Sequence, residues 1–317
     1  MHEEQCGLMT LKPPLSLDTE VLVTGVAYSR RRRQLRRTAE SYSFLAPTLV
    51  LLLVLMIVPI VMVIGYSLQS NVILSKNSQF VGLENYVTIL GDGAFWKATS
   101  NTVIFTVVSV AAHLVLGLGF ALMLNSPLIG GVSRAIFRGL YVLPWLFTVA
   151  VIAVLWRMLL APNGVINFLL HSDIEWLASP QLALGTVTFI NIWAGYPFFM
   201  VSLLAGLQGI PSDLYEAATV DGASSVQRFW NVTVPQLRPI IVSLLLLDLI
   251  WTSQQFALIW MTTGGGPIDV TEVLSTFTYK LAFAKYDFSL AATSAVLVLL
   301  MSMVLAVFYV RHQKARD

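Results

Sequence analysis

Residues 44–68 form a run of 25 residues that contains no charged side chain. A helix rises about 1.5 Å per residue, so about 20 apolar residues are enough to cross the hydrocarbon layer of a membrane. Because lipid offers no water to backbone polar groups, such a run is predicted to be a helix. Five further runs reach this length, at 101–124, 137–160, 182–207, 240–261 and 288–310. The sequence therefore predicts an all-α membrane protein with six transmembrane helices.

The overall composition excludes an ordinary soluble domain. Hydrophobic residues make up 56% of the chain and charged residues 11%, whereas soluble domains carry about 25% charged residues. The net charge of +2 is too small to indicate nucleic-acid binding. The single cysteine, Cys6, excludes an intrachain disulfide. None of the four histidines has a second ligand four residues on, so no metal site is predicted.

The N-terminal segment is polar and carries six arginines between Arg30 and Arg37. A signal peptide also begins with positive charge, but its apolar core is short and ends at a cleavage site. The run at 44–68 is longer and has no Ala-x-Ala ending, so we expect an uncleaved first helix. The predicted parts are a disordered cytoplasmic tail (1–41), a transmembrane domain (42–312) and a cytoplasmic C-terminal tail (313–317).

Lysines and arginines indicate the orientation, because cytoplasmic loops of membrane proteins are enriched in them. With a cytoplasmic N-terminus, 14 of the 19 basic residues fall in cytoplasmic segments and four in outer loops. Arg157 lies near the outer end of the third run, where its side chain is expected to extend to the interface. Both termini and the interval 210–239 are therefore predicted to be cytoplasmic.

The interval 210–239 is the least hydrophobic long stretch of the second half, and it predicts two helices separated by a glycine. Ser212 is the expected N-cap of the first helix, and Gly222 suits the left-handed position that ends it. Ser224 and Gln227 have the spacing of a capping box. The second helix is expected to stop before Pro235, because proline disfavours helical geometry in the residue before it.

The faces of these two helices predict a docking surface for another protein. Small residues on one side of the first helix allow a second backbone to approach closely, and Glu216 adds one charge at the edge. That side is formed by Leu214, Ala217, Ala218 and Asp221. The second helix has an apolar face formed by Val226, Phe229 and Trp230.

The order Glu216-Ala217-Ala218, then Gly222, then Val232-Thr233-Val234-Pro235 resembles the EAA loop of binding-protein-dependent ABC importer permeases. Val232 and Val234 stand where that family favours isoleucine and leucine, and both keep the apolar character. The resemblance implies the type I importer permease fold with a cytoplasmic coupling hairpin. It assigns contact with the ATPase to Glu216, Ala217, Ala218, Asp221, Gly222 and Pro235.

The predicted outer segments extend the resemblance over about residues 42–312. Residues 80–86 and 264–267 are similar to the first and last external loops of carbohydrate-type permeases. They point to the first-permease type of the maltose and glycerol-phosphate class. Residues 285–290 depart from the pattern, because the family usually has a glycine there.

The sequence contains no catalytic apparatus of its own. It has no Gly-x-x-x-x-Gly-Lys-Ser/Thr loop to hold phosphates, and Gly264-Gly265-Gly266 is interpreted as a flexible turn. No Ser/His/Asp arrangement or close carboxylate pair indicates an active site. We therefore predict that the chain is not an enzyme and assign no catalytic residue, cofactor or metal to it.

The resemblance implies that the missing functions come from partners. ATP and Mg would be bound by two copies of an ATP-binding subunit docked on the 210–239 hairpin. A second, homologous permease and an extracytoplasmic solute-binding protein would complete an importer in the bacterial cytoplasmic (inner) membrane. The implied solute is a mono- or disaccharide, a polyol or a glycerol phosphate.

Polar residues inside the spans are candidates for the solute path, because such residues usually face protein or water. Asp248, Thr252 and Gln255 form one stripe with Trp251 beside it, and Asn191 and Tyr196 lie in the fourth run. Hydroxyls of a sugar can bond the acid and amide groups, and its C–H face can stack on the indole. The alternative is that Asp248 and Gln255 bond between helices, an interaction of about 0.6–2 kcal/mol in membranes. His113 is expected to be a hydrogen-bonded packing residue.

Two other functions are less well supported. An ion-coupled secondary transporter usually has inverted repeats and several ionisable groups in its spans, whereas only Asp248 is clearly mid-span here. A membrane enzyme would need the catalytic cluster that is missing.

Overall fold

The computed structural model describes residues 45–73 and 78–314. The predicted tail 1–41 lies outside the described residues. The chain divides into two parts, Met1–Met62 and Val63–Asp317. In the first part, residues 45–62 form the beginning of an uncharged helix, Leu45–Ser67, that ends in the second part.

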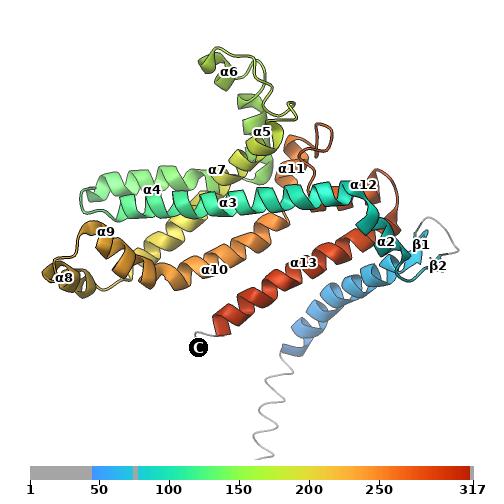
Figure 1. Cartoon of the computed structure of the whole chain (residues 1–317), viewed down its shortest axis with the longest axis horizontal. Helices are drawn as coiled ribbons and strands as arrows, with labels where there is room; N and C mark the ends of the chain where they lie inside the picture. The colour runs from blue at the N-terminus through green and yellow to red at the C-terminus, as the bar shows by residue number, and fades with distance from the viewer. Residues whose placement is uncertain (1–44, 74–77, 315–317) are drawn as a thin grey trace, which may run out of the picture. The chain divides into compact units, whose positions relative to one another are not determined.

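Within the described residues, five helices are long and apolar enough to cross a membrane, and a bent pair of helices can form a sixth span. Four predicted spans are confirmed as continuous helices (Figure 1). These are the helix Leu45–Ser67, α3 (Gly93–Asn125), α7 (Ala183–Gln208) and α13 (Phe288–Lys314). The only strands in the described part of the chain are two residues each, β1 (Gln69–Ser70) and β2 (Gln79–Phe80), paired antiparallel. The predicted all-α class is confirmed.

The third predicted span, 137–160, is not one helix. α4 (Gly131–Leu146) and α5 (Val149–Leu159) meet at a bend of 98°. Pro144 removes a backbone N–H near the end of α4. Thr148 then caps α5 by accepting a hydrogen bond from its first turn. A proline followed by a new N-cap ends one helix and starts another in a new direction.

The fifth predicted span, 240–261, begins earlier and is interrupted. One continuous helix runs from Ser225 to Ser253, and a short break separates it from α11 (Ala257–Thr262). Its successive segments are α9 (Ser225–Arg228), the π turn η1 (Phe229–Thr233) and α10 (Val234–Ser253).

The prediction that this helix stops before Pro235 is therefore wrong. In η1 the Val234 N–H donates to the Phe229 carbonyl, five residues back. The wider turn places Pro235 in the first turn of α10, where the missing N–H of a proline is tolerated.

The remaining helices are short and lie in the connections between spans. They are α2 (Glu84–Gly91), α6 (Val165–Leu170), α8 (Ser212–Val220) and α12 (Leu274–Phe283). α2 and α12 share a buried core with the beginnings of α3 and α13, in which Ile89, Phe95 and Phe277 are almost completely buried. This second core holds the ends of the two spans together.

The main core lies where α3 packs on α7, and α10 joins it. Its buried side chains are Ala121, Leu124, Phe199, Met200, Leu203, Leu204, Leu207, Leu237 and Leu244. Gly117 permits this contact, because a Cβ there would lie 2.4 Å from the Phe199 Cβ and 2.9 Å from the Met200 backbone N. Gly119, on the same helix, has no atom within 4 Å of the corresponding point.

We expect Gly117→Val to lower the free energy of unfolding by about 1–3 kcal/mol, because the new side chain must force α3 and α7 apart. Gly119→Val introduces the same side chain in the same helix without a clash, and it is the matched control. The thermal midpoints of the two purified variants measure the difference. Equal midpoints would contradict the close helix contact.

Candidate functional site

The predicted docking hairpin, 210–239, turns at Gly222. That residue has φ +77°, and the next N–H, of Ala223, donates to the Ala218 carbonyl at the end of α8 (2.9 Å). A left-handed position of this kind favours glycine because it has no Cβ. The predicted glycine break is confirmed.

The two helix starts in the hairpin differ in how well they were predicted. The capping box is present: Ser224 Oγ accepts from the Gln227 N–H (3.3 Å), and the Ser224 N–H donates to Gln227 Oε1 (2.8 Å). Ser212, however, is not the N-cap of α8. Pro211 holds that position in an extended conformation, so Ser212 is already the first helical residue.

Two side-chain contacts tie the halves of the hairpin together. Tyr215 Oη and Thr233 Oγ1 are 2.9 Å apart, and Arg228 Nη1 donates to Thr219 Oγ1 (3.0 Å). Sequence analysis did not find these pairs, because each joins residues of two helices on opposite sides of the Gly222 turn, where helical periodicity does not apply. α8 is thus hydrogen-bonded to the helix that continues into α10.

The hairpin presents apolar side chains to its surroundings. α8 contains no buried residue, and Val220 is 88% exposed. Of the predicted face, Leu214, Ala217 and Asp221 are exposed and Ala218 is half-buried. The second helix exposes Val226 and Trp230. Clustered exposed apolar side chains indicate an interaction surface.

A polar network joins α3, α7 and α10 inside the main core. His113 Nδ1 lies 2.7 Å from Asp248 Oδ2, and His113 Nε2 lies 3.1 Å from the Asn191 carbonyl oxygen. Thr252 Oγ1 donates to Asp248 Oδ1 (3.0 Å), and Gln255 Nε2 donates to Asn191 Oδ1 (3.4 Å). The structure therefore brings together four of the six predicted path residues.

His113 connects this network, and the prediction that it is a hydrogen-bonded packing residue is confirmed. Its side chain is 2% exposed and contacts residues of two other helices. A histidine in one apolar run and an acid in another could have been paired from the sequence only with knowledge of their depths.

The other two predicted path residues lie apart from the network. Trp251 is 57% exposed and packs on the Phe198 ring. Tyr196 donates to the Tyr141 carbonyl of α4 (3.1 Å). A role of all six residues in a solute path stays a prediction, because the same contacts serve helix packing.

Comparison with known proteins shows the family to which this chain belongs. Residues 113–316 match the family described as binding-protein-dependent transport system inner membrane component. The chain belongs to this family. It is therefore a transport component of the permease type, and the family resemblance inferred from the 216–235 pattern is confirmed.

Several relatives match nearly the whole permease. The trehalose/maltose transport system permease protein MalF of Thermococcus litoralis is 34% identical over 89% of this chain and 96% of its own length. The sulfoquinovosyl glycerol transport system permease protein SmoG of Agrobacterium fabrum is 32% identical over 86% and 90%. A permease chain in a crystal structure of a bacterial ABC transporter that imports alginate superposes with a TM-score of 0.78. At 24% identity, over 90% of this chain and 99% of that one, it confirms the type I importer permease fold.

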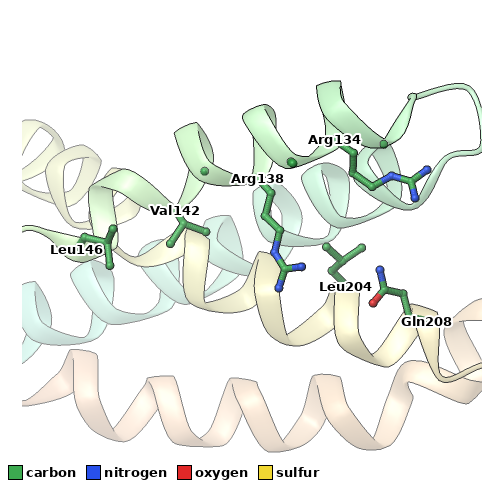
Figure 2. A pocket seen from close by; sticks show the side chains of 9 residues that line it. Arg134, Arg138, Val142, Leu146, Leu204 and Gln208 are labelled. Carbon is green, nitrogen blue, oxygen red and sulfur yellow. The ribbon is translucent and has the colours of Figure 1, made fainter.

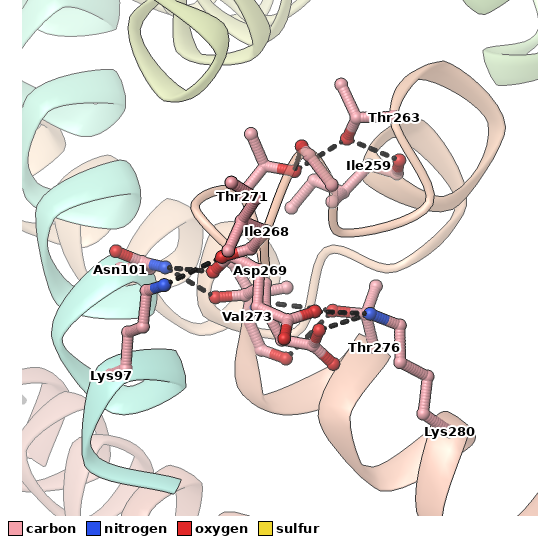
Figure 3. A network of polar contacts seen from close by, with 12 residues as sticks. Lys97, Asn101, Ile259, Thr263, Ile268, Asp269, Thr271, Val273, Thr276 and Lys280 are labelled. Atoms are coloured by element: carbon pink, nitrogen blue, oxygen red, sulfur yellow. Dashed lines mark hydrogen bonds and ion pairs between the residues drawn. The ribbon is translucent and has the colours of Figure 1, made fainter. Parts of the chain in front are cut away.

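The loop between α11 and α12 of the permease is held by polar contacts from both sides, as Figure 3 shows. The predicted turn is present, with φ +63° at Gly264 and +91° at Gly265. From α3, Lys97 Nζ donates to the Ile268 carbonyl (2.8 Å), and Asn101 Nδ2 donates to the Glu272 carbonyl (2.9 Å). The loop is thereby anchored to a span.

Glu272 is the buried charge of this loop. Its carboxylate is paired with Lys280 of α12, and Lys280 also bonds Asp269 Oδ1 (3.0 Å). Burial raises the pKa of Glu272 to about 7, with the neighbouring Asp269 adding to the rise and Lys280 opposing it. The other oxygen, Oε1, has no hydrogen-bond partner among the described residues.

We expect the 264–273 loop to become less stable as the pH rises from 5 to 8. The pKa of Glu272 in the folded loop is raised above its ordinary 4.5. The contribution of Glu272 to the stability of the loop is therefore fully present below pH 4.5 and is lost as the pH rises through about 7. Protection factors from hydrogen exchange measure the change. Glu272→Gln should abolish the dependence, whereas Asp269→Asn should retain it, because the lowered pKa of Asp269 keeps it ionised in this window. An equal pH response in wild type and Glu272→Gln would contradict this assignment.

Proposed function

We propose that this chain is the membrane-spanning subunit of an ABC importer for a sugar or sugar-like solute, driven by ATP-binding subunits that dock on the 210–239 hairpin. The observation that carries the proposal is the hairpin itself: an exposed apolar surface joined without interruption to a span. The carbohydrate solutes in the names of the maltose and sulfoquinovosyl glycerol relatives support the solute class.

The hairpin has the construction that a mechanical link needs. A partner that grips α8 also holds Thr233, through Tyr215. Thr233 lies in the helix that continues without a break to Ser253. Asp248 lies 15 residues beyond Thr233, or about 22 Å along that helix at 1.5 Å per residue. Movement of the docked ATPases would therefore reach the polar network as movement of one rigid helix.

The polar network supplies groups suited to a solute with many hydroxyls. Asp248, Thr252 and Gln255 offer acceptors and donors, and Trp251, on the same helix as Asp248 but outside the network, offers an exposed indole for stacking. The Asn191 Nδ2 is buried and has no partner among the described residues. A rearrangement of α10 against α7 would expose these groups to the solute, as expected of an assembly with two alternative states.

The remaining parts of the importer follow from the proposal. A second, homologous permease would cover the exposed faces of the spans, and an extracytoplasmic solute-binding protein would deliver the solute. Two ATP-binding subunits would hold ATP and Mg on the cytoplasmic side of the inner membrane, where both termini of this chain would lie. Membership of a binding-protein-dependent family favours this arrangement over an ion-coupled secondary transporter.

We expect Gly222→Val to leave the permease in the membrane but to reduce co-purification of the ATP-binding subunits at least tenfold. A β-branched residue is strained at φ +77°, by about 1–3 kcal/mol, and the strain would unwind the turn that presents α8. Gly222→Asn is the matched control, because asparagine tolerates the left-handed region. Glu216→Lys should cause a comparable loss and Glu216→Gln a smaller one. A tight, active complex with Gly222→Val would refute the docking role.

We expect Trp251→Ala and Asp248→Asn to reduce solute uptake about tenfold, the effect of losing about 1.4 kcal/mol of contact with the solute. Ser253→Ala is the control, because the Ser253 hydroxyl, among the residues that the structure describes, bonds only the Ile250 carbonyl of its own helix. Uptake is measured per amount of assembled complex. Wild-type uptake by both variants at normal expression would contradict the solute-path role and indicate that the network serves helix packing alone.

A further inference from the structure

A groove of about 520 Å³ runs between α4 and the end of α7, and Figure 2 shows the side chains that line it. Arg134 and Arg138 project from α4, and Leu204 and Gln208 lie opposite on α7. The groove is also lined by three small residues of α4, which leave it open beside the arginines. They are Gly131, Ala135 and Gly139. A Cβ at Gly139 would meet no atom within 4 Å.

The two arginines leave donors without acceptors. Arg134 Nη2 donates to the carbonyls of Ser126 (2.9 Å) and Ile129 (3.0 Å), but its Nε is buried and unpaired within the described residues. Arg138 has no hydrogen bond or ion pair to any described residue. An arginine inside a membrane-spanning segment is costly unless an acceptor or water meets it. The planar guanidinium of Arg138, with all its donors free of described residues, matches phosphate oxygens in geometry.

The groove changes from charged to apolar along α4. Arg138 lies seven residues from the start of the helix, which is about 10 Å at 1.5 Å per residue. Val142 and Leu146 line the groove one and two turns further on. A phospholipid has the same order along the membrane normal, with a phosphate at the surface and acyl chains below it. A small soluble anion has no apolar part that could contact Val142 and Leu146.

We propose that this groove binds an anionic phospholipid, whose phosphodiester accepts hydrogen bonds from Arg138, Arg134 and Gln208 and whose acyl chain lies along Val142 and Leu146. Basic pockets between transmembrane helices bind anionic headgroups by this chemistry. The proposal requires only that α4 begins at a membrane surface, so it does not depend on the hairpin docking an ATPase.

The test uses the permease purified as the assembly in which it is expressed, stripped of lipid and titrated in neutral detergent with dioleoylphosphatidylglycerol or dioleoylphosphatidylcholine. Native mass spectrometry counts the retained lipids. We expect the phosphatidylglycerol to bind at least tenfold more tightly than the phosphatidylcholine. Arg138→Gln should weaken phosphatidylglycerol binding about tenfold, the loss expected for one charge-assisted contact. Because Arg138 bonds no residue in the described part of the chain, the variant should assemble normally.

Two further variants distinguish binding in the groove from nonspecific attraction of the anionic lipid to positive charge. Gly139→Leu fills the groove without changing the charge, and it should weaken phosphatidylglycerol binding as Arg138→Gln does. Arg238→Gln removes an exposed arginine of α10 outside the groove and should have no effect. Equal binding of the two lipids, or equal losses in Arg138→Gln and Arg238→Gln, would overturn the proposal. So would displacement of the lipid by millimolar glycerol phosphate, which would indicate a soluble ligand. Dissociation of the assembly in Arg138→Gln would likewise overturn it, because it would indicate an acidic residue of a partner protein.

Discussion

The close approach of α3 and α7 is the contact on which the rest of the described fold depends. At Gly117 and Gly195 one helix meets the other where a side chain is missing: a Cβ at Gly195 would lie 2.3 Å from His113 Nε2. His113 therefore fits against the α7 backbone and reaches the Asn191 carbonyl on one side and Asp248 on the other. In this buried interior each hydrogen bond is stronger than in water, and each unpaired group costs more. Three spans are thereby fixed at one depth.

The packing of α3, α7 and α10 at this network is connected to the hairpin through a single helix. α10 joins the core through Asp248, and its helix continues through the π turn η1 to the hairpin at Ser225. A π turn is a frequent place for a functional bend, because its wider ring loosens the regular hydrogen bonding. The network at one end of this helix and the exposed hairpin at the other form a single element with two contact sites. A bend at the π turn would allow α10 to shift between two packed arrangements as one unit.

Local patterns in the sequence were sufficient for features that depend on neighbours along the chain. Four of the six apolar runs are confirmed as continuous helices. The left-handed Gly222 and the Ser224–Gln227 capping box follow from residues within one or two turns, and the structure confirms both. The break after Leu146 and the π turn before Pro235 were missed, because a proline signals a disturbance without specifying its geometry. His113–Asp248 was missed as a pair because 135 residues separate them. The Arg138 groove was missed for a similar reason: one wall comes from α4 and the other from α7.

Two sets of ionisable side chains in the membrane helices differ in whether the described chain supplies a partner. His113 and Asp248 are hydrogen-bonded to each other within the described chain. Arg138 has no such partner, and it lies opposite the last turns of α7. Leu204 and Gln208, which face it, precede the first residue of α8 by only eight and four residues. Anything bound between Arg138 and these two residues would therefore contact the last turns of α7, which lead into α8. If α8 docks an ATPase as proposed, a lipid in the groove would influence the position of α8 without touching either the ATPase or the solute, because the end of α7 lines the groove and leads into α8.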